Sequence, residues 1–287
     1  MIKKYHIGLT QWGYQPWKEN FFSKDSRPDE FLNQYSSVFN AVEGNTTFYR
    51  VPELKTVKEW GSKVPDGFKF CFKFPRTITH DKRLNDVQDD AKRFVSLFEP
   101  IREKLGPFHI QLSDKFSYSE MGKLESFLMD LPADVSFAVE VRHPDFYDKG
   151  KKEDYLLRLL RTLNMDRVIF DTRKLHSMRS NEESVIEAQQ KKPQPNIRFE
   201  ATGSRPFIRY IGANDELNNE VYLKEWAIVL ADWIKEGLHP YFFIHAPDTF
   251  FAPVLARRFH LELSKLIELQ PMPEWPAERK DEQLNLF

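Results

Sequence analysis

Short β-like runs alternate with amphipathic stretches of helical length along most of this chain, and this alternation restricts its fold more than any other feature. The pattern is typical of parallel strands covered by helices. Eight runs can be counted, at residues 5–10, 40–43, 68–73, 107–112, 135–141, 167–170, 206–211 and 241–245. Because no repeat at solenoid spacing accompanies them, they predict a single (β/α)8 TIM-like barrel over residues 1–269. An open, doubly wound sheet is the alternative.

Two stretches depart from the alternation. Residues 172–201 include a polar, proline-broken loop, Lys191-Lys-Pro-Gln-Pro-Asn196, which predicts an irregular insertion or a mobile lid. Beyond Leu269, three prolines and a charged run preclude a packed helix through Pro276. Residues 270–287 are therefore predicted to form a flexible C-terminal tail.

Charge balance and cysteine content narrow the class of protein. The 287 residues include 42 basic and 43 acidic ones, so no overall field draws the chain to nucleic acid or to an anionic membrane, and any anion site must be local. The single cysteine, Cys71, excludes an internal disulfide and a multi-cysteine metal site. No uncharged apolar run approaches the ~20 residues of a membrane helix, and the N-terminus lacks a signal-peptide pattern. A cytoplasmic protein without a membrane partner is expected.

Alternation within the strand-like runs predicts which side chains face the barrel interior. In residues 68–74 every phenylalanine falls on one face, suited to packing under helices, so the residues between them, Cys71 among them, face inward. The same alternation turns a set of polar side chains toward the interior or its C-terminal rim: Thr10, Glu43, Asn45, Lys73, His109, Gln111, Glu140, Arg142, Arg209 and His245. Barrel enzymes place their catalytic groups at this rim, so the convergence predicts a site there.

Three chemistries fit the residue types at this rim, beside the alternative of a buried ion network without a ligand. Lys73, Arg142 and Arg209 are suited to clamp a phosphate or carboxylate, which accounts for basic groups on a neutral protein. Glu43 and Glu140 suit the acid and base of sugar hydrolysis. A divalent metal is a third option without a diagnostic ligand spacing; its candidate ligands are Glu43, His80, Glu140, His143, Asp171 and His245.

Two loops would border the site. Trp12-Gly-Tyr14-Gln-Pro-Trp17, followed by Phe21-Phe22, comes after the first strand and predicts a hydrophobic plug over the barrel top or a stacking platform. The loop from Lys73 to His80 follows the third strand, and His80 is either a loop-capping hydrogen-bond partner or a functional group.

The motifs, in this order, resemble the YecE-like family, also called the domain of unknown function 72 family. They are Gly8-Leu-Thr-Gln-Trp-Gly-Tyr14 with Trp17, Val42-Glu-Gly-Asn-Thr-Thr-Phe-Tyr49, Phe68-Lys-Phe-Cys-Phe-Lys73 with Ile78-Thr-His80, and Ala138-Val-Glu-Val-Arg-His143. The resemblance implies a TIM-like barrel, no established reaction, and polar positions at Glu43, Asn45, Tyr49, Lys73, His80, Glu140, Arg142, His143 and Arg209. Two segments depart from the family pattern: Gln111-Leu-Ser113, usually Gln-Leu-Pro, and Ile244-His-Ala246, usually rich in asparagine.

The last five residues carry a separate resemblance. Gln283-Leu-Asn-Leu-Phe287 is similar to the pentapeptide Gln-Leu-(Ser or Asp)-Leu-Phe with which many bacterial polymerases and repair proteins bind the replication sliding clamp. In such a complex Leu284, Leu286 and Phe287 would be apolar anchors and Gln283 a polar contact. The alternative is that these side chains fold back on the barrel.

These observations combine into one expectation. The barrel is expected to bind or act on an anionic, phosphate-bearing substrate, with a nucleic-acid-derived compound as one option, and the clamp is expected to recruit it to DNA. The alternatives are a non-catalytic clamp accessory protein and a carboxylate-pair hydrolase of a sugar-like substrate. Whether the protein is an enzyme stays open; if it is one, the candidate types are a hydrolase and a metal-assisted phosphoester enzyme. The expected catalytic residues are Glu43, Glu140, His80 and Lys73, and the substrate-binding residues are Asn45, Tyr49, Arg142, His143, Arg209, Gln111 and Trp12.

Overall fold

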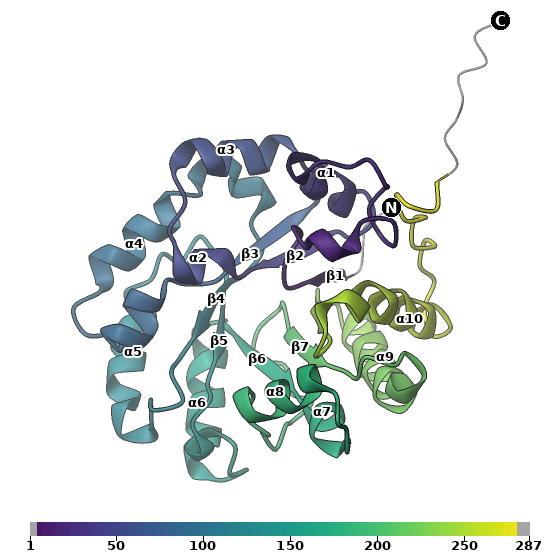
Figure 1. The fold of residues 1–287 in the computed structure, drawn as a ribbon. Helices are drawn as coiled ribbons and strands as arrows, with labels where there is room; N and C mark the ends of the chain where they lie inside the picture. The colour runs from purple at the N-terminus through teal and green to yellow at the C-terminus, as the bar shows by residue number, and fades with distance from the viewer. Residues whose placement is uncertain (1–4, 280–287) are drawn as a thin grey trace, which may run out of the picture.

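The predicted barrel is confirmed by the computed structural model, which describes residues 5–279. Eight parallel strands follow one another in the order β3-β2-β1-β8-β7-β6-β5-β4, so the first and last strands of the chain are neighbours (Figure 1). The strands are β1 (His6–Leu9), β2 (Ala41–Gly44), β3 (Lys69–Phe72), β4 (Phe108–Gln111), β5 (Phe137–Glu140), β6 (Asp166–Asp171), β7 (Phe207–Ile211) and β8 (Tyr241–His245). Each lies within two residues of the run that predicted it.

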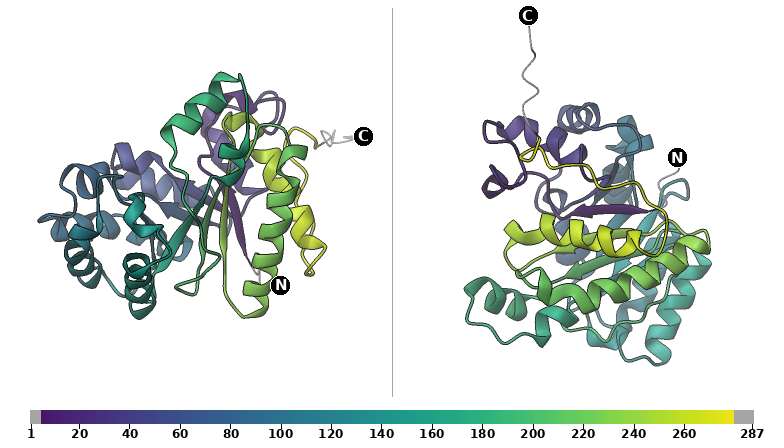
Figure 2. Two further views of the ribbon diagram at one scale, coloured as in Figure 1. Left: turned by 90° about the horizontal axis from the view of Figure 1, so that it is seen from below. Right: turned by 90° about the vertical axis from the view of Figure 1, so that its right-hand side faces the viewer.

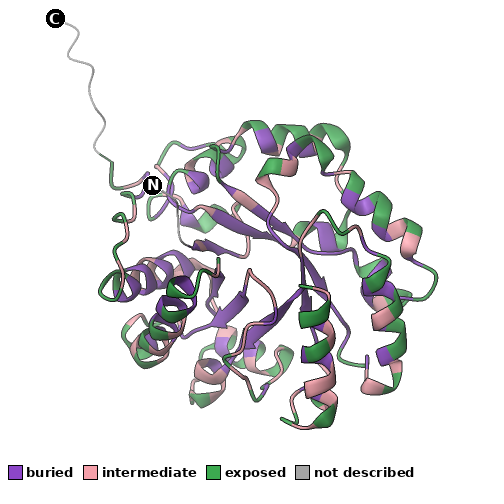
Figure 3. Ribbon diagram, turned by 180° about the vertical axis from the view of Figure 1, so that it is seen from behind, coloured by how far each residue is buried: buried purple, intermediate pink, exposed green. Residues whose placement is uncertain are grey.

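Helices surround the sheet (Figure 2). They bury one face against the strands and expose the other, as the green outer surfaces and purple strands of Figure 3 show. The helices are α1 (Phe31–Ser36), α2 (Thr46–Tyr49), α3 (Leu54–Ser62), α4 (Gln88–Ser96), α5 (Met121–Met129), α6 (Lys151–Thr162), α7 (Arg173–Ser177), α8 (Glu183–Lys191), α9 (Glu220–Lys235) and α10 (Ala252–Ser264). Within residues 5–279, none of them has both the length and the apolar character needed to cross a membrane.

The two sides of the strands are packed as the alternation predicts. Cys71 faces the barrel interior, in a buried cluster with Ala41, Ala138, Val168, Phe207, Tyr241 and Phe243. The four phenylalanines of residues 68–74 are fully buried in the separate, larger core between strands and helices. Small and aromatic side chains therefore fill the inward positions of this layer, and the polar side chains of Glu43, Glu140 and Arg209 lie nearer the C-terminal mouth.

Barrel closure between β3 and β4 relies on little backbone pairing. These strands share two isolated bridges, Phe70 with Leu105 and Lys73 with His109, whereas β2 and β3 pair over four positions. The Phe74 N–H donates to the His109 carbonyl at 2.8 Å. This seam places Lys73 directly beside His109 at the C-terminal end of the barrel.

Side chains complete the pairing between β1 and β2. The Tyr35 hydroxyl accepts from the Leu9 N–H at 2.7 Å and donates to the Ala41 carbonyl at 2.9 Å. The Asn40 side chain accepts from the Ile7 N–H at 2.7 Å and donates to the Tyr5 carbonyl at 3.0 Å. Buried backbone groups that lack a strand partner are satisfied in this way.

The insertion after β6 is partly helical, because it contains α7 and α8. Val185 and Ala188 of α8 pack with Leu175 of α7 and with Phe170 and Ile211 of the barrel. Further hydrogen bonds fasten the segment: Gln189 donates to the carbonyls of Leu175 and Met178, and Thr172 donates to that of Pro193. In the left view of Figure 2, the teal-green helices of this insertion lie at the upper end of the strands.

The first part of the expected tail is packed, which corrects the boundary at residue 269. Trp275 is 9 % exposed, with its ring centroid 5.7 Å from that of Phe21. The Arg257 guanidinium lies 3.6 Å above the Trp275 ring and donates two hydrogen bonds of 2.7 Å to Glu278. Prolines exclude a helix here, but a large aromatic side chain still gains from burial without one. The clamp-like pentapeptide at residues 283–287 lies outside the described residues.

Candidate functional site

Polar side chains from six strands or strand ends meet at the C-terminal mouth of the barrel. We call this set the mouth cluster; it consists of Glu43, Lys73, His109, Gln111, Glu140, Arg142, Arg209 and His245. Each occupies an inward position within its strand or just beyond the strand's end, so the barrel geometry brings together residues that are up to 202 positions apart in the chain.

Arg209 lies at the centre of the cluster, between two fully buried carboxylates. Its Nε donates to Glu43 Oε2 at 2.8 Å, and its Nη1 donates to Glu140 Oε2 at 2.7 Å. Arg142 approaches from the rim, where its Nε donates to the other Glu140 oxygen, Oε1, at 2.7 Å. Both carboxylates are thus already paired with guanidinium groups.

Gln111 connects this ion network to Lys73. Its Oε1 accepts from Lys73 Nζ at 2.7 Å and from Arg142 Nη2 at 2.9 Å. Lys73 Nζ also lies 4.2 Å above the ring of Phe48. Within residues 5–279 Lys73 forms no salt bridge, although its side chain is only 7 % exposed.

Three buried polar atoms of the cluster lack a well-aligned hydrogen bond within residues 5–279: Glu43 Oε1, His109 Nδ1 and His245 Nε2. The last of these still lies 3.4 Å from Glu43 Oε2. His109 Nε2 lies 3.0 Å from Glu140 Oε2 and must donate, because an ionised carboxylate only accepts. In neutral His109 the remaining nitrogen, Nδ1, is then an acceptor, and it faces the acceptor Glu43 Oε1 at 3.8 Å. The arrangement is suited to hold a hydrogen-bond donor between these two atoms.

The pKa values show which groups carry charge. Burial alone would raise the pKa of Glu43 and Glu140, but Arg209, helped by His245 at Glu43 and by Arg142 at Glu140, holds both pKa values well below the usual range. Burial lowers the pKa of His109, and lowers that of His245 to about 3. Both carboxylates are therefore ionised and both histidines neutral at physiological pH.

The lysine at the mouth titrates near neutrality. Burial, reinforced by the positive charge of Arg209, lowers the pKa of Lys73 to about 7. Burial and the charge of Lys73 lower the pKa of His80 to about 4. His80 adjoins the cluster through Phe48, whose ring centroid lies 4.9 Å from that of the imidazole, while its Nδ1 is 2.9 Å from Thr79 Oγ1.

Sequence reasoning missed two contributors to the mouth. Phe170 of β6 lies under both arginines, 5.2 Å from the Arg142 guanidinium carbon and 5.1 Å from that of Arg209. Lys192 comes from the insertion, and burial together with the charges of Arg209 and Arg142 lowers its pKa to about 8. The sequence held one indication of Lys192, namely the adjacent lysines Lys191 and Lys192 in the polar loop, but nothing in the sequence shows which of the two faces the mouth.

Other expected site residues lie away from the cluster. Tyr49 is 81 % exposed. His143 Nδ1 accepts from the Asp145 N–H and caps a short helical turn. The sequence did not indicate this local role, because His143 follows a strand end as a site residue would. Asp171 faces outward, where it accepts from Arg173 and from the Trp226 indole. Asn45 donates to the Thr10 carbonyl at 3.1 Å and so ties two rim loops together.

The tryptophan-rich loop contributes to the layer between strands and helices. Trp12, which is half-buried, makes edge contacts with Trp60 and Phe70, and Trp17 is fully buried. A stacking role for Trp12 stays a prediction. In the described part of the chain, no three histidine, cysteine, aspartate or glutamate side chains are grouped so that they could hold a metal ion.

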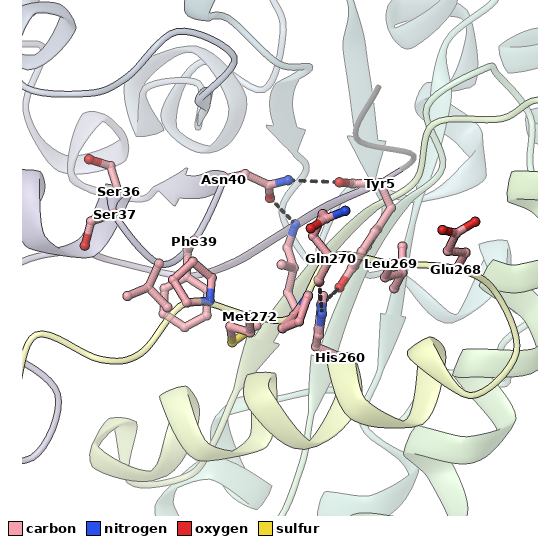
Figure 4. A pocket seen from close by; sticks show the side chains of 14 residues that line it. Tyr5, Ser36, Ser37, Phe39, Asn40, His260, Glu268, Leu269, Gln270 and Met272 are labelled. Atoms are coloured by element: carbon pink, nitrogen blue, oxygen red, sulfur yellow. Dashed lines mark hydrogen bonds between the residues drawn. The ribbon is translucent and has the colours of Figure 1, made fainter. Parts of the chain in front are cut away.

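A separate cavity of about 350 Å³ lies near the starts of β1 and β2, at the opposite end of the barrel (Figure 4). Its polar groups bond to one another: Asn40 binds the backbone of Tyr5 and Ile7, while the two His260 ring nitrogens contact the Tyr5 hydroxyl and the Gln270 carbonyl. These polar groups are thus bonded to one another within the described part of the chain, whereas the mouth gathers charged and polar groups from six strands or strand ends, so the mouth is the better candidate site.

Fold and site together define a single-domain (β/α)8-barrel protein with a cation-rich polar cluster at its C-terminal mouth. The chain belongs to the family described as "Protein of unknown function DUF72", whose model matches residues 6–279. The resemblance seen in the motifs is thereby confirmed.

Individual relatives agree with this assignment. The chain is 35 % identical over 274 residues to the UPF0759 protein YecE of Escherichia coli K12, a match that covers 95 % of this chain and 98 % of YecE. It is 26 % identical over 103 residues to the UPF0759 protein YunF of Bacillus subtilis, covering 36 % and 34 %. A crystal structure of a DUF72 family protein from Enterococcus faecalis has the same fold, with a TM-score of 0.66 at 18 % identity, covering 92 % and 98 %.

Proposed function

We propose that the barrel mouth binds, or acts on, an anionic, phosphate-bearing small molecule. The observation that carries the proposal is an excess of positive charge among the described residues of the mouth: Arg142, Arg209 and Lys192 face two carboxylates, Glu43 and Glu140, and Lys73, with its pKa of about 7, adds part of a further charge. Burying unbalanced cations is costly unless a ligand supplies the missing negative charge. Arg142, whose side chain is 20 % exposed, and Lys192 are the groups nearest to solvent that could meet it.

The charge states favour this proposal over a carboxylate-pair hydrolase. A general acid in glycoside hydrolysis must hold a proton near neutral pH, which requires a raised pKa. Both carboxylates here have lowered pKa values because each is paired with Arg209. Glu43 and Glu140 are better suited to fix the guanidinium groups in place than to donate a proton.

Lys192 provides the sharpest test of the anion site. We expect Lys192→Met to weaken binding of inorganic phosphate by roughly 10- to 100-fold, the loss expected for one charge-assisted hydrogen bond. The affinity of the unaltered protein should fall from about pH 8 to about pH 9.5, a range in which phosphate is mostly a dianion while Lys192, with a pKa of about 8, loses its proton. Isothermal titration calorimetry measures both effects.

Lys191→Met is the matched control for this experiment. Lys191 is the preceding residue, but it is exposed and paired with Glu187 on the outer side of α8. Its replacement should leave phosphate binding unchanged. An equal loss in the two variants, or no phosphate binding by the unaltered protein, would refute the anion site.

We further propose that the C-terminal pentapeptide recruits the protein to the sliding clamp, either as an enzyme of DNA metabolism or as a non-catalytic accessory protein. The sequence of residues 283–287 carries this proposal. One structural observation favours it: Arg279, the last described residue, is exposed. A short peptide that departs from a surface can reach a partner pocket without unfolding the barrel.

Truncation tests the recruitment. We expect the full chain to bind a purified bacterial sliding clamp in surface plasmon resonance, and a chain ending at Glu282 to lose at least about 10-fold in affinity, because Leu284, Leu286 and Phe287 supply the apolar anchors. Phosphate binding at the mouth should be equal in both proteins. Equal clamp affinity would exclude a role for the pentapeptide.

A further inference from the structure

Lys73 is a buried amine whose surroundings do not provide the usual partner for a buried cation. Lysine is almost never fully buried unless it is paired with a carboxylate. Here both nearby carboxylates are engaged by Arg209 and Arg142, and the only hydrogen bond of Lys73 Nζ goes to the neutral oxygen of Gln111, among residues 5–279. The other near neighbour of the amine is the face of the Phe48 ring.

Hydrogen bonds hold the Lys73 backbone in a fixed place, and Gln111 Oε1 orients its amine. The Lys73 N–H donates to the Gly44 carbonyl at 3.2 Å, and the Lys73 carbonyl accepts from Thr47 Oγ1 at 2.6 Å. The bridge to His109 closes the barrel at the same residue. A rigid strand end, instead of a flexible loop, therefore presents the amine beside the cationic groups of the mouth.

We propose that Lys73 is a nucleophile that forms an imine with a carbonyl group of the anion bound at the mouth, a step that rests on the proposed anion site. An amine that is desolvated and surrounded by other cations loses its proton easily, and the free base is the form that attacks carbonyl carbon. The substrate class is thus a small phosphorylated aldehyde or ketone, held through its phosphate by Arg142 and Lys192.

The step balances without an oxidant or a reductant. The Nζ lone pair attacks the carbonyl carbon, the carbonyl oxygen takes up a proton, and a carbinolamine forms. The remaining N–H proton passes, directly or through solvent, to the hydroxyl group, which leaves as water while the nitrogen lone pair forms the carbon–nitrogen double bond. One amine and one carbonyl are converted into one imine and one water. The lowered pKa of Lys73, about 7, keeps a large share of the amine unprotonated at neutral pH.

Pyridoxal 5′-phosphate, an aldehyde with a phosphate group, is a suitable probe. The full chain is incubated with it, reduced with sodium borohydride to convert any imine into a stable secondary amine, digested, and mapped by mass spectrometry. We expect Lys73 to be labelled at least about 10-fold more than Lys235, an exposed lysine of α9 with an ordinary surface partner, Asp232. Excess inorganic phosphate should suppress the label on Lys73 and not that on Lys235.

The outcomes separate this inference from the anion site on which it rests. Lys73 left unlabelled, or a label on Lys192 in its place, overturns the imine even where calorimetry shows phosphate binding that depends on Lys192. A label on Lys73 that pyridoxal without phosphate produces equally, and that phosphate does not suppress, overturns the phosphorylated substrate. The mapping uses the unaltered protein, so it does not depend on whether a Lys73 variant folds.

Discussion

Replacement of Arg209 by methionine is expected to destabilise the folded protein by about 3–5 kcal/mol, the cost of leaving buried charges without their partner. Arg209 donates to Glu43 and Glu140, and both carboxylates are fully buried. Without the guanidinium, their negative charges repel each other in a region of low dielectric. Guanidinium chloride unfolding, followed by circular dichroism, measures the loss.

Two controls show whether the effect arises from these carboxylates. Arg76→Met removes an arginine whose ion pair with Asp81 is largely exposed, and should change stability little. Adding Glu43→Gln and Glu140→Gln to Arg209→Met removes the unpaired charges and should restore part of the lost stability. If Arg209→Met unfolds at the same denaturant concentration as Arg76→Met, Arg209 does not balance the buried charge.

Gly8→Ala is expected to be the most damaging small substitution, with a loss of at least about 3 kcal/mol, the upper part of the range for overpacking. A Cβ atom at Gly8 would lie 2.0 Å from the Ala41 carbonyl oxygen and 2.7 Å from its carbon. It would also lie 3.0 Å from the Tyr35 hydroxyl that links β1 to β2. Relief would require the backbones of β1 and β2 to separate, because no flexible side chain can move aside.

Gly13→Ala is the matched control, since no heavy atom lies within 4 Å of a Cβ built there. Both glycines belong to the same loop-and-strand motif and both substitutions add one methyl group. Soluble yield and the denaturation midpoint should be close to those of the unaltered protein for Gly13→Ala and strongly reduced for Gly8→Ala. Similar midpoints for the two variants would contradict the close approach of β1 to β2.

Much of the fold could be predicted because it depends on local periodicity. Phenylalanines at every second position between residues 68 and 74 mark one face of a strand, and eight such runs leave few arrangements other than a barrel. The same period-two rule predicted that Glu43, Glu140 and Arg209 face inward, since a strand has only two faces. Most of the mouth cluster was therefore visible before the structure.

Site residues in loops were predicted less well, because loop side chains have no periodicity that fixes their direction. His143 follows a strand end in the sequence, yet it caps a turn, and Tyr49 points to solvent although it ends the second family motif. Lys191 and Lys192 are identical in type and adjacent, and only the packing of α8 against α7 decides which one faces the mouth.

The sequence by itself determined the barrel, the inward faces of its strands and the local character of any anion site on a chain of nearly zero net charge. The tertiary structure alone decided that both carboxylates are taken by Arg209, that Lys73 is left beside Phe48 and Gln111 without an acidic partner, and that Lys192 joins them from the insertion. The physical reason is that charge pairing depends on distances of a few ångströms between separate strands, and no pattern along one chain segment encodes those distances.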